Sequence, residues 1–159
     1  MKETKYFIVE ADVDKINLIT WNQEIEQERK SAVFDLLNNG KFKLYNKNET
    51  GPYKINIKLL EWKLLLRVID TFDGSISDLK ISISNVRRIL RDYQIVCDNY
   101  VEAIKTAPLK KIEAIDVGRR SINDEGAGML LESFKEKVEI DMDTARRLFT
   151  LVSIISIKI

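Results

Sequence analysis

The sequence predicts an α+β fold, in which an antiparallel meander sheet of three to four strands has helices packed on one face. Two hydrophobic patterns support this prediction. Residues 53–83 alternate between apolar and polar side chains, and from Ser84 onward apolar residues recur at helical spacing. The C-terminal half is therefore expected to be mostly helical. Because 159 residues suffice to bury one core, we expect a single α+β domain over residues 1–159.

The N-terminal part of the chain is expected to form one strand and one helix. Residues 6–9 are rich in β-forming side chains, whereas the region from there to Thr20 has no clear period. A helix is expected over residues 23–38, because Asn22 is a good N-cap and acids follow it where the helix dipole favours them. The Asn-Asn-Gly of residues 38–40 should end this helix.

Three short strands with tight links are expected next. Residues 53–59 and 62–69 each place alternate apolar side chains on one face. Residues 79–83 repeat this period after an Asp-Gly turn, which is typical of a hairpin. These segments predict the antiparallel meander, and residues 42–45 are the candidate for a fourth strand.

The helices of the C-terminal half are delimited by capping residues. Ser84 is the expected N-cap of a helix whose apolar stripe spans residues 86–104. Pro108 opens the next helix, and its apolar stripe continues to Val138. Asp141 is the expected N-cap of the last helix.

The composition excludes several kinds of chemistry. The net charge of +1 is spread evenly along the chain, which argues against nucleic acid or a membrane surface as a partner. The chain has no histidine, which excludes Ser-His-Asp and Cys-His catalysis and histidine-ligated metals. Zinc spacings and nucleotide-binding motifs are also missing, so we expect no metal and no cofactor. Any general base would be a carboxylate or, less readily, a lysine or tyrosine.

The cysteine count and the lengths of the apolar stretches predict where the protein is located in the cell. One cysteine cannot form an internal disulfide, and Cys97 falls on an apolar helical stripe, which predicts a buried and unreactive thiol. The start of the sequence lacks the apolar run of a secretory signal. The longest apolar stretch is too short to cross a bilayer, so a cytoplasmic location is expected.

Several separated blocks of the sequence carry a resemblance to a known family. They are ERKSAVFDLL, GPYKINIKL, RRILRDYQIVCDNYVEAI, IEAIDVGRR and DTARRLFTL. Together they resemble uncharacterised protein family 0262, a group of small bacterial proteins, over about residues 24–151. The resemblance implies a bacterial, cytoplasmic, single-domain protein and implies no catalytic activity.

The stretch from Glu113 to Leu130 concentrates polar residues, with two adjacent arginines, four acids and three glycines. One interpretation is a capped joint near residues 121–123, held by ion pairs between two helices. A second is an anion site, with an arginine fork beside the free N–H groups of a helix start and Glu125 as the base. A third is one unbroken helix, in which Arg119 and Asn123 lie on the apolar stripe and need partners from another helix.

The arginines are clustered late in the chain. Seven of the nine lie between residues 87 and 147, and six of these form doublets at positions 87–88, 119–120 and 146–147. They form either cross-helix ion pairs or a shared cleft for phosphate or carboxylate groups. The candidate anion site comprises Arg88, Arg119, Arg120, Glu125, Arg146 and Arg147.

These features favour a small binding or regulatory module that acts through protein contacts or an anionic ligand; homo-oligomerisation stays open. The alternative is a small enzyme on a phosphorylated or carboxylate substrate, with arginines for binding and Glu125 or Asp124 as base. A cleft that holds the arginines beside a carboxylate of raised pKa would support the enzyme. A large, flat apolar patch would support the module.

Overall fold

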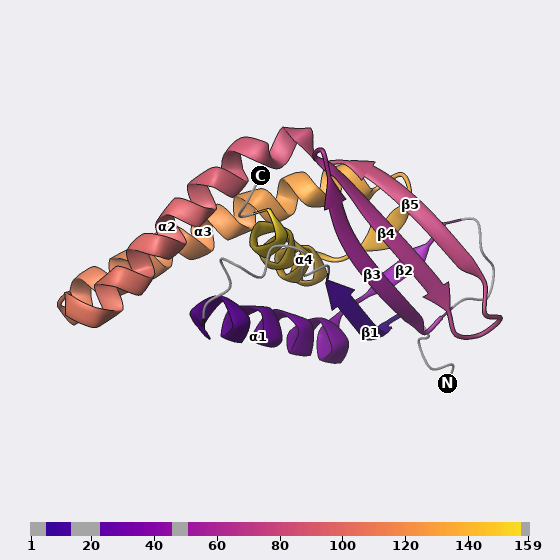
Figure 1. Ribbon diagram of the computed structural model, residues 1–159, viewed down its shortest axis with the longest axis horizontal. Coiled ribbons are helices and arrows are strands. Elements are labelled where there is room, and N and C mark those ends of the chain that lie inside the picture. Colours follow the sequence, from indigo (N-terminus) through magenta and orange to yellow (C-terminus); the bar gives the residue numbers. More distant parts are fainter. Residues whose placement is uncertain (1–5, 14–22, 46–50, 157–159) are drawn as a thin grey trace.

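The computed structural model describes residues 6–13, 23–45 and 51–156. Figure 1 shows a sheet at one side of the molecule and the helices at the other. The elements in chain order are β1 (Ile8–Val13), α1 (Gln23–Asn39), β2 (Phe42–Leu44), β3 (Tyr53–Leu60), β4 (Lys63–Asp70), β5 (Ile76–Ser82), the 3₁₀ turn η2 (Ser84–Val86), α2 (Arg87–Thr106), α3 (Leu109–Phe134), β6 (Val138–Ile140) and α4 (Met142–Ile155). The α+β class and the helical C-terminal half are confirmed, whereas the assignment of the whole chain to one domain stays a prediction.

The expected three-stranded meander is present. Strands β3, β4 and β5 pair antiparallel in chain order, with Ile57 opposite Leu66 and Leu66 opposite Leu79. Tyr53, Ile55 and Ile57 of β3 are buried on the inner face. This match follows from the period of two, since alternate side chains of a strand point to opposite faces of the sheet.

The sheet as a whole is mixed, so the prediction of a purely antiparallel sheet is wrong. The strand order is β1-β3-β4-β5, and β1 pairs with β3 in parallel. This strand spans Ile8–Val13 rather than residues 6–9. Because α1 lies in the connection from β1 to β3, the chain has the long crossover that parallel neighbours require.

The segment expected as a fourth meander strand belongs to a second, smaller sheet. Strand β2 pairs antiparallel with β6, and Leu44 lies opposite Val138. Val138 is therefore a strand residue and does not continue the helical stripe of α3. Sequence periodicity missed this pairing because both partners are three-residue strands nearly a hundred positions apart.

The helix starts follow the sequence in part. Asp141 caps α4, because its Oδ1 accepts a hydrogen bond from the Thr144 backbone N–H at 2.9 Å. Ser84 is not the cap of α2: it begins the turn η2, and α2 starts at Arg87 without a side-chain cap. The predicted cap Asn22 lies outside the described residues.

Helix α3 is unbroken from Leu109 to Phe134, so the predicted joint near residues 121–123 is wrong. Each glycine lowers the stability of a helix by about 1 kcal/mol relative to alanine. Packing of a long helix against its neighbours offsets this loss. Of the three glycines, only Gly126 is at a close contact, with the Phe149 ring, whereas Gly118 and Gly128 face open space.

The helices converge on α4. In Figure 1, α2 and α3 form a hairpin that extends away from the sheet, and α4 lies between this hairpin and α1. The side of α4 that faces the core buries Leu148, Phe149 and Val152. The arginines of α4 are only partly buried, so they sit where α1, α3 and α4 meet the solvent.

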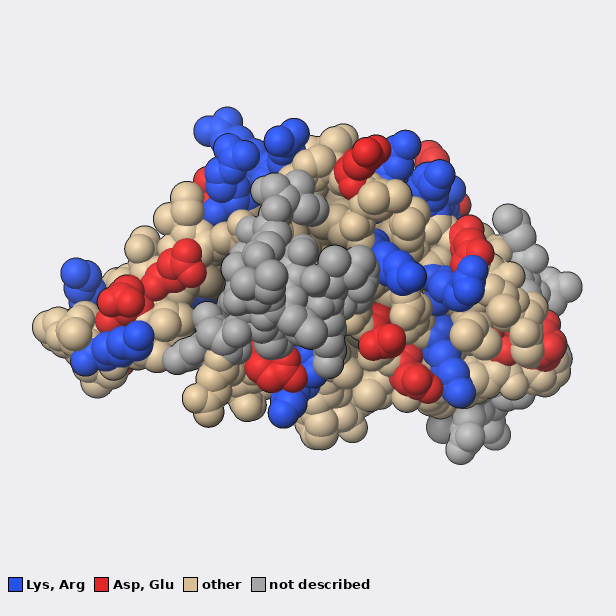
Figure 2. Space-filling model, viewed as in Figure 1, with Lys and Arg blue, Asp and Glu red and all other residues tan. Residues whose placement is uncertain are grey.

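The surface carries both signs of charge. Figure 2 shows lysines and arginines interspersed with acids over the face in view, as expected from the even charge of the sequence. Of the helices that the structure describes, none is both long and apolar enough for a membrane crossing. The cytoplasmic location stays a prediction.

Candidate functional site

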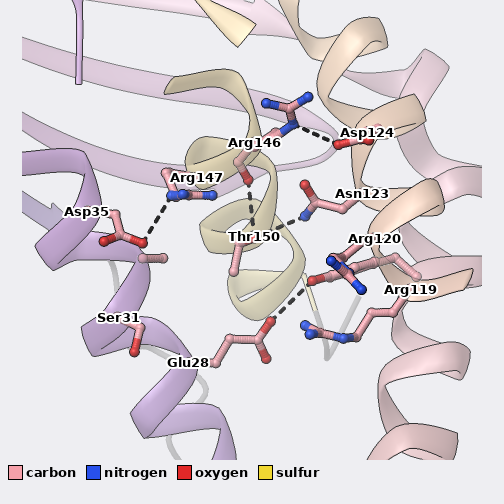
Figure 3. Close-up of a pocket in the computed structure, with 12 residues that line it drawn as sticks. Glu28, Ser31, Asp35, Arg119, Arg120, Asn123, Asp124, Arg146, Arg147 and Thr150 are labelled. Carbon is pink, nitrogen blue, oxygen red and sulfur yellow. Dashed lines mark hydrogen bonds and ion pairs between the residues drawn. The ribbon is translucent and has the colours of Figure 1, made fainter. Parts of the chain in front are cut away.

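A polar pocket opens where the four helices meet. Its volume is about 450 Å³, within the range typical of small-molecule sites. Figure 3 shows α1 on one side, α3 on the other and α4 between them. The lining residues are Glu28, Ser31, Ala32, Asp35, Tyr93, Arg119, Arg120, Asn123, Asp124, Arg146, Arg147 and Thr150.

The arginines of α3 are oriented by one aspartate. Asp116 lies one turn earlier on the helix, and its Oδ1 accepts from Arg119 Nη2 at 2.6 Å and from Nε at 3.1 Å. Its Oδ2 lies 3.2 Å from Arg120 Nη2. The Arg119 guanidinium also stacks over the Tyr100 ring, 4.8 Å from its centroid. Arg119 is therefore fixed, whereas the Arg120 side chain is 68% exposed and free to adjust.

The arginines of α4 connect the walls of the pocket. Arg146 Nε lies 2.7 Å from Asp124 Oδ1 of α3, and its Nη1 donates to Asp143. Arg147 Nε lies 3.2 Å from Asp35 Oδ2 of α1. These cross-helix pairs place two guanidinium groups on the pocket wall without engaging all of their N–H donors.

Glu28 lies at the α1 side of the pocket, next to groups from α2 and α3. Its Oε1 accepts a hydrogen bond from the Tyr93 hydroxyl at 3.2 Å. Burial raises the pKa of the Glu28 carboxyl, although Arg119 and the Tyr93 hydroxyl both favour the ionised form. The ionised carboxylate is therefore incompletely compensated in the free protein.

Two further side chains connect α3 to α4 beside the arginines. Asn123 donates through Nδ2 to Thr150 Oγ1 at 3.1 Å, and the Thr150 hydroxyl donates to the Arg146 carbonyl at 3.1 Å. The unbroken-helix interpretation required such a partner for Asn123, and α4 supplies it. This bond leaves the Asn123 carbonyl oxygen as an acceptor at the pocket.

The chain is similar to known proteins along nearly its whole length. The model of the uncharacterised protein family (UPF0262) matches residues 5–158. The chain belongs to the UPF0262 family. A UPF0262 protein of Dinoroseobacter shibae is 37% identical over 152 residues, which cover 93% of this chain and 96% of that protein. A UPF0262 protein of Jannaschia sp. is 41% identical over 150 residues, with the same coverage.

Another relative matches a shorter part of the chain. A UPF0262 protein of Rhizobium etli is 41% identical over 132 residues, or 83% of each chain. No solved structure matches the chain. UPF0262 is a bacterial family without an assigned activity, so the function of this member is inferred from its pocket.

The pocket unites four of the six predicted site residues of this UPF0262 chain. Arg119, Arg120, Arg146 and Arg147 all line it. The other two candidates lie elsewhere: Arg88 is exposed on α2, and Glu125 is exposed on α3 outside the pocket lining. Of the two alternatives for the doublets, a cleft shared by all three is therefore not formed, because Arg88 lies apart from the other arginines. Glu125 is displaced because it lies about 100° around the helix from Asp124, which faces the pocket.

The α1 side of the pocket was missed as a ligand surface. Glu28, Ser31 and Asp35 recur at spacings of three and four, which places them on one face of a helix. This polar stripe is a local signal that could have identified the wall. Thr150 lies four residues after Arg146, so the same spacing could have identified it too.

Cys97 is expected to react slowly in the native protein. The residue is half-buried and not buried as predicted, although it packs against the core. Burial, followed by the nearby Glu28, raises the pKa of its thiol to about 12. Since the thiolate is the reactive form, labelling by an aromatic disulfide at pH 8 should be about a hundredfold slower in native than in denatured protein. Equal rates in the two states would contradict the docking of α2.

Proposed function

We propose that this chain binds a small ligand that carries a phosphate or carboxylate group in the pocket between α1, α3 and α4. The main support is the arrangement of Arg119–Arg120 and Arg146–Arg147. These doublets are at least 26 positions apart in sequence, yet all four arginines line one pocket. Planar guanidinium groups match the oxygens of phosphate and carboxylate in a bidentate manner, so several together favour an anionic ligand.

The surrounding acids support this role by positioning the arginines. Asp35 and Asp116 contact Arg147 and Arg120 through one nitrogen each. These two arginines thus retain donors on the remaining nitrogens, since a guanidinium has five N–H groups. An exposed ion pair contributes about 0–1 kcal/mol, so an incoming anion can compete with it. We assign direct ligand contact to Arg120 and Arg147, and a positioning role to Arg119.

A variant that retains charge tests this assignment. Arg147→Lys should weaken anion binding about tenfold, because lysine keeps the charge and loses the planar fork. Its melting temperature without ligand should change by only about 2 °C, as expected for the loss of an exposed pair. The measurement is a thermal-shift titration with phosphate, pyrophosphate, nucleotides and small dicarboxylates at fixed ionic strength.

Two matched arginine variants act as controls. Arg88→Lys lies outside the pocket and should bind anions like the wild type. Arg119→Lys should lower the melting temperature of the free protein, because it loses the fork on Asp116 and the stack on Tyr100. If no anion stabilises the wild type, the arginines serve only in ion pairs within and between helices, and the proposal is overturned.

The alternative of a small enzyme rests on Glu28. A carboxylate of raised pKa beside arginines suits acid-base chemistry on a bound phosphorylated or carboxylate substrate. Glu28 replaces Glu125 in that role, since Glu125 does not line the pocket. Asp124 is a weaker base candidate because Arg146 holds it in an ion pair. If the protein converts a bound ligand into a product, it is an enzyme; if it only binds the ligand, this alternative is wrong.

A further inference from the structure

The walls of the pocket carry opposite charges. The α1 wall supplies the acids Glu28 and Asp35 together with the Ser31 hydroxyl. The facing surfaces of α3 and α4 supply the four arginines, and Figure 3 shows Glu28 and Arg120 approaching the cavity from opposite sides. A ligand that only carried negative charge would be repelled by the acidic wall.

Glu28 differs from the other acids of the pocket. Asp35 pairs with Arg147, and Asp124 pairs with Arg146. No ion pair joins Glu28 to any residue that the structure describes; its hydrogen bond comes from the Tyr93 hydroxyl, which is uncharged. Arg119 is the nearby cation, and its fork is directed at Asp116.

The charged and titratable groups around Glu28 leave its charge under-compensated. Tyr93 and Cys97 of α2 are held neutral, since burial raises the pKa of each. Arg119 of α3 acts on Glu28 through space, yet burial outweighs it and the pKa of Glu28 remains raised. A partly buried carboxylate of this kind gains more from a new cation than an exposed one does, because its own hydration is already reduced.

From this juxtaposition we propose that the ligand is zwitterionic: its ammonium group binds Glu28, while its phosphate or carboxylate binds Arg120 and Arg147. This inference rests on the proposed function and specifies the ligand class, namely aminoalkyl phosphates or amino acids. Ser31 lies on the same wall as Glu28, and its hydroxyl is a further acceptor for an ammonium group.

Isothermal titration with matched pairs of probes tests the inference. Phosphoethanolamine is compared with ethyl phosphate, and β-alanine with propionate, at pH 7 and fixed ionic strength. The two pairs distinguish a phosphate from a carboxylate as the anionic group. In at least one pair, the probe with the amine should bind the wild type about tenfold more tightly than the probe without it, since a charge-assisted hydrogen bond is added.

Variants of Glu28 assign the preference to its carboxylate. Glu28→Gln keeps the shape and should reduce the tenfold preference to about twofold or less. Affinity for the amine-free probe should be unchanged or slightly higher, because one acid of the α1 wall has lost its charge. Glu28→Asp keeps the charge and should retain part of the preference. Glu125→Gln is the matched control, because Glu125 is exposed outside the pocket, and it should retain the full preference.

The outcomes separate the two proposals. If ethyl phosphate or propionate binds and the amine adds nothing, the zwitterionic ligand is overturned and the anion site stands. A preference that survives in Glu28→Gln also overturns the role of Glu28. Should none of the four probes bind the wild type, both this inference and the anion site are overturned for these two anion classes.

Discussion

Replacement of Phe149 by alanine is expected to lower the free energy of unfolding by about 3–5 kcal/mol, the usual cost of deleting a buried phenyl ring. Phe149 is fully buried on α4, and its ring packs edge-on against Tyr93, with centroids 5.3 Å apart. The deletion would leave a cavity beside Tyr93. Because the Tyr93 hydroxyl donates to Glu28, this cavity would also make the pocket wall less ordered. Thermal unfolding should show a melting temperature lower by about 10 °C.

An exposed phenylalanine provides the matched control. Phe34 also lies on a helix but is 66% exposed, so Phe34→Ala should change stability by no more than about 0.5 kcal/mol. Similar losses for the two variants would contradict the packing of α4 between α1 and the α2–α3 hairpin.

Gly126→Ala should destabilise the protein by about 2–3 kcal/mol, although alanine is normally the better helix residue. A Cβ at Gly126 would come within less than 3.0 Å of the Phe149 ring. The ring has little room to move because Tyr93 packs against it, so the substitution overpacks the core. Chemical denaturation of the variant measures this loss.

The same substitution elsewhere on α3 should have the opposite sign. Gly118 is on the same helix and a Cβ there meets nothing within 4 Å, so Gly118→Ala should stabilise by about 0.5–1 kcal/mol. Combining Gly126→Ala with Phe149→Ala should cost less than the sum of the two, since the methyl group occupies space that the ring vacates. Additive losses would contradict the contact.

Much of the secondary structure was predictable because its causes are local. The period of two over residues 53–69 follows from alternating side chains along each strand, and it identified β3 and β4. The cap at Asp141 depends only on the next three residues. Ser84 was misleading, since a capping residue type does not by itself force α-helical geometry on the turn that follows.

Strand pairing was predictable only where the linking turns are short. The links between β3, β4 and β5 are too short for a parallel crossover, so these strands pair antiparallel with their neighbours in sequence. The parallel partner of β1 and the partner of β2 lie far along the chain, and a hydrophobic period gives neither the direction nor the partner of a strand.

The candidate site divides in the same way. By itself the sequence determined that the chemistry would rest on arginines and carboxylates, because it has no histidine, and it identified the doublets. Only the tertiary structure decided that Arg147 lines the pocket whereas Arg88 does not, and that Glu28 lines it whereas Glu125 does not. The physical reason is that residue type and helical face are local properties, whereas which faces meet is decided by the packing of the whole core around α4.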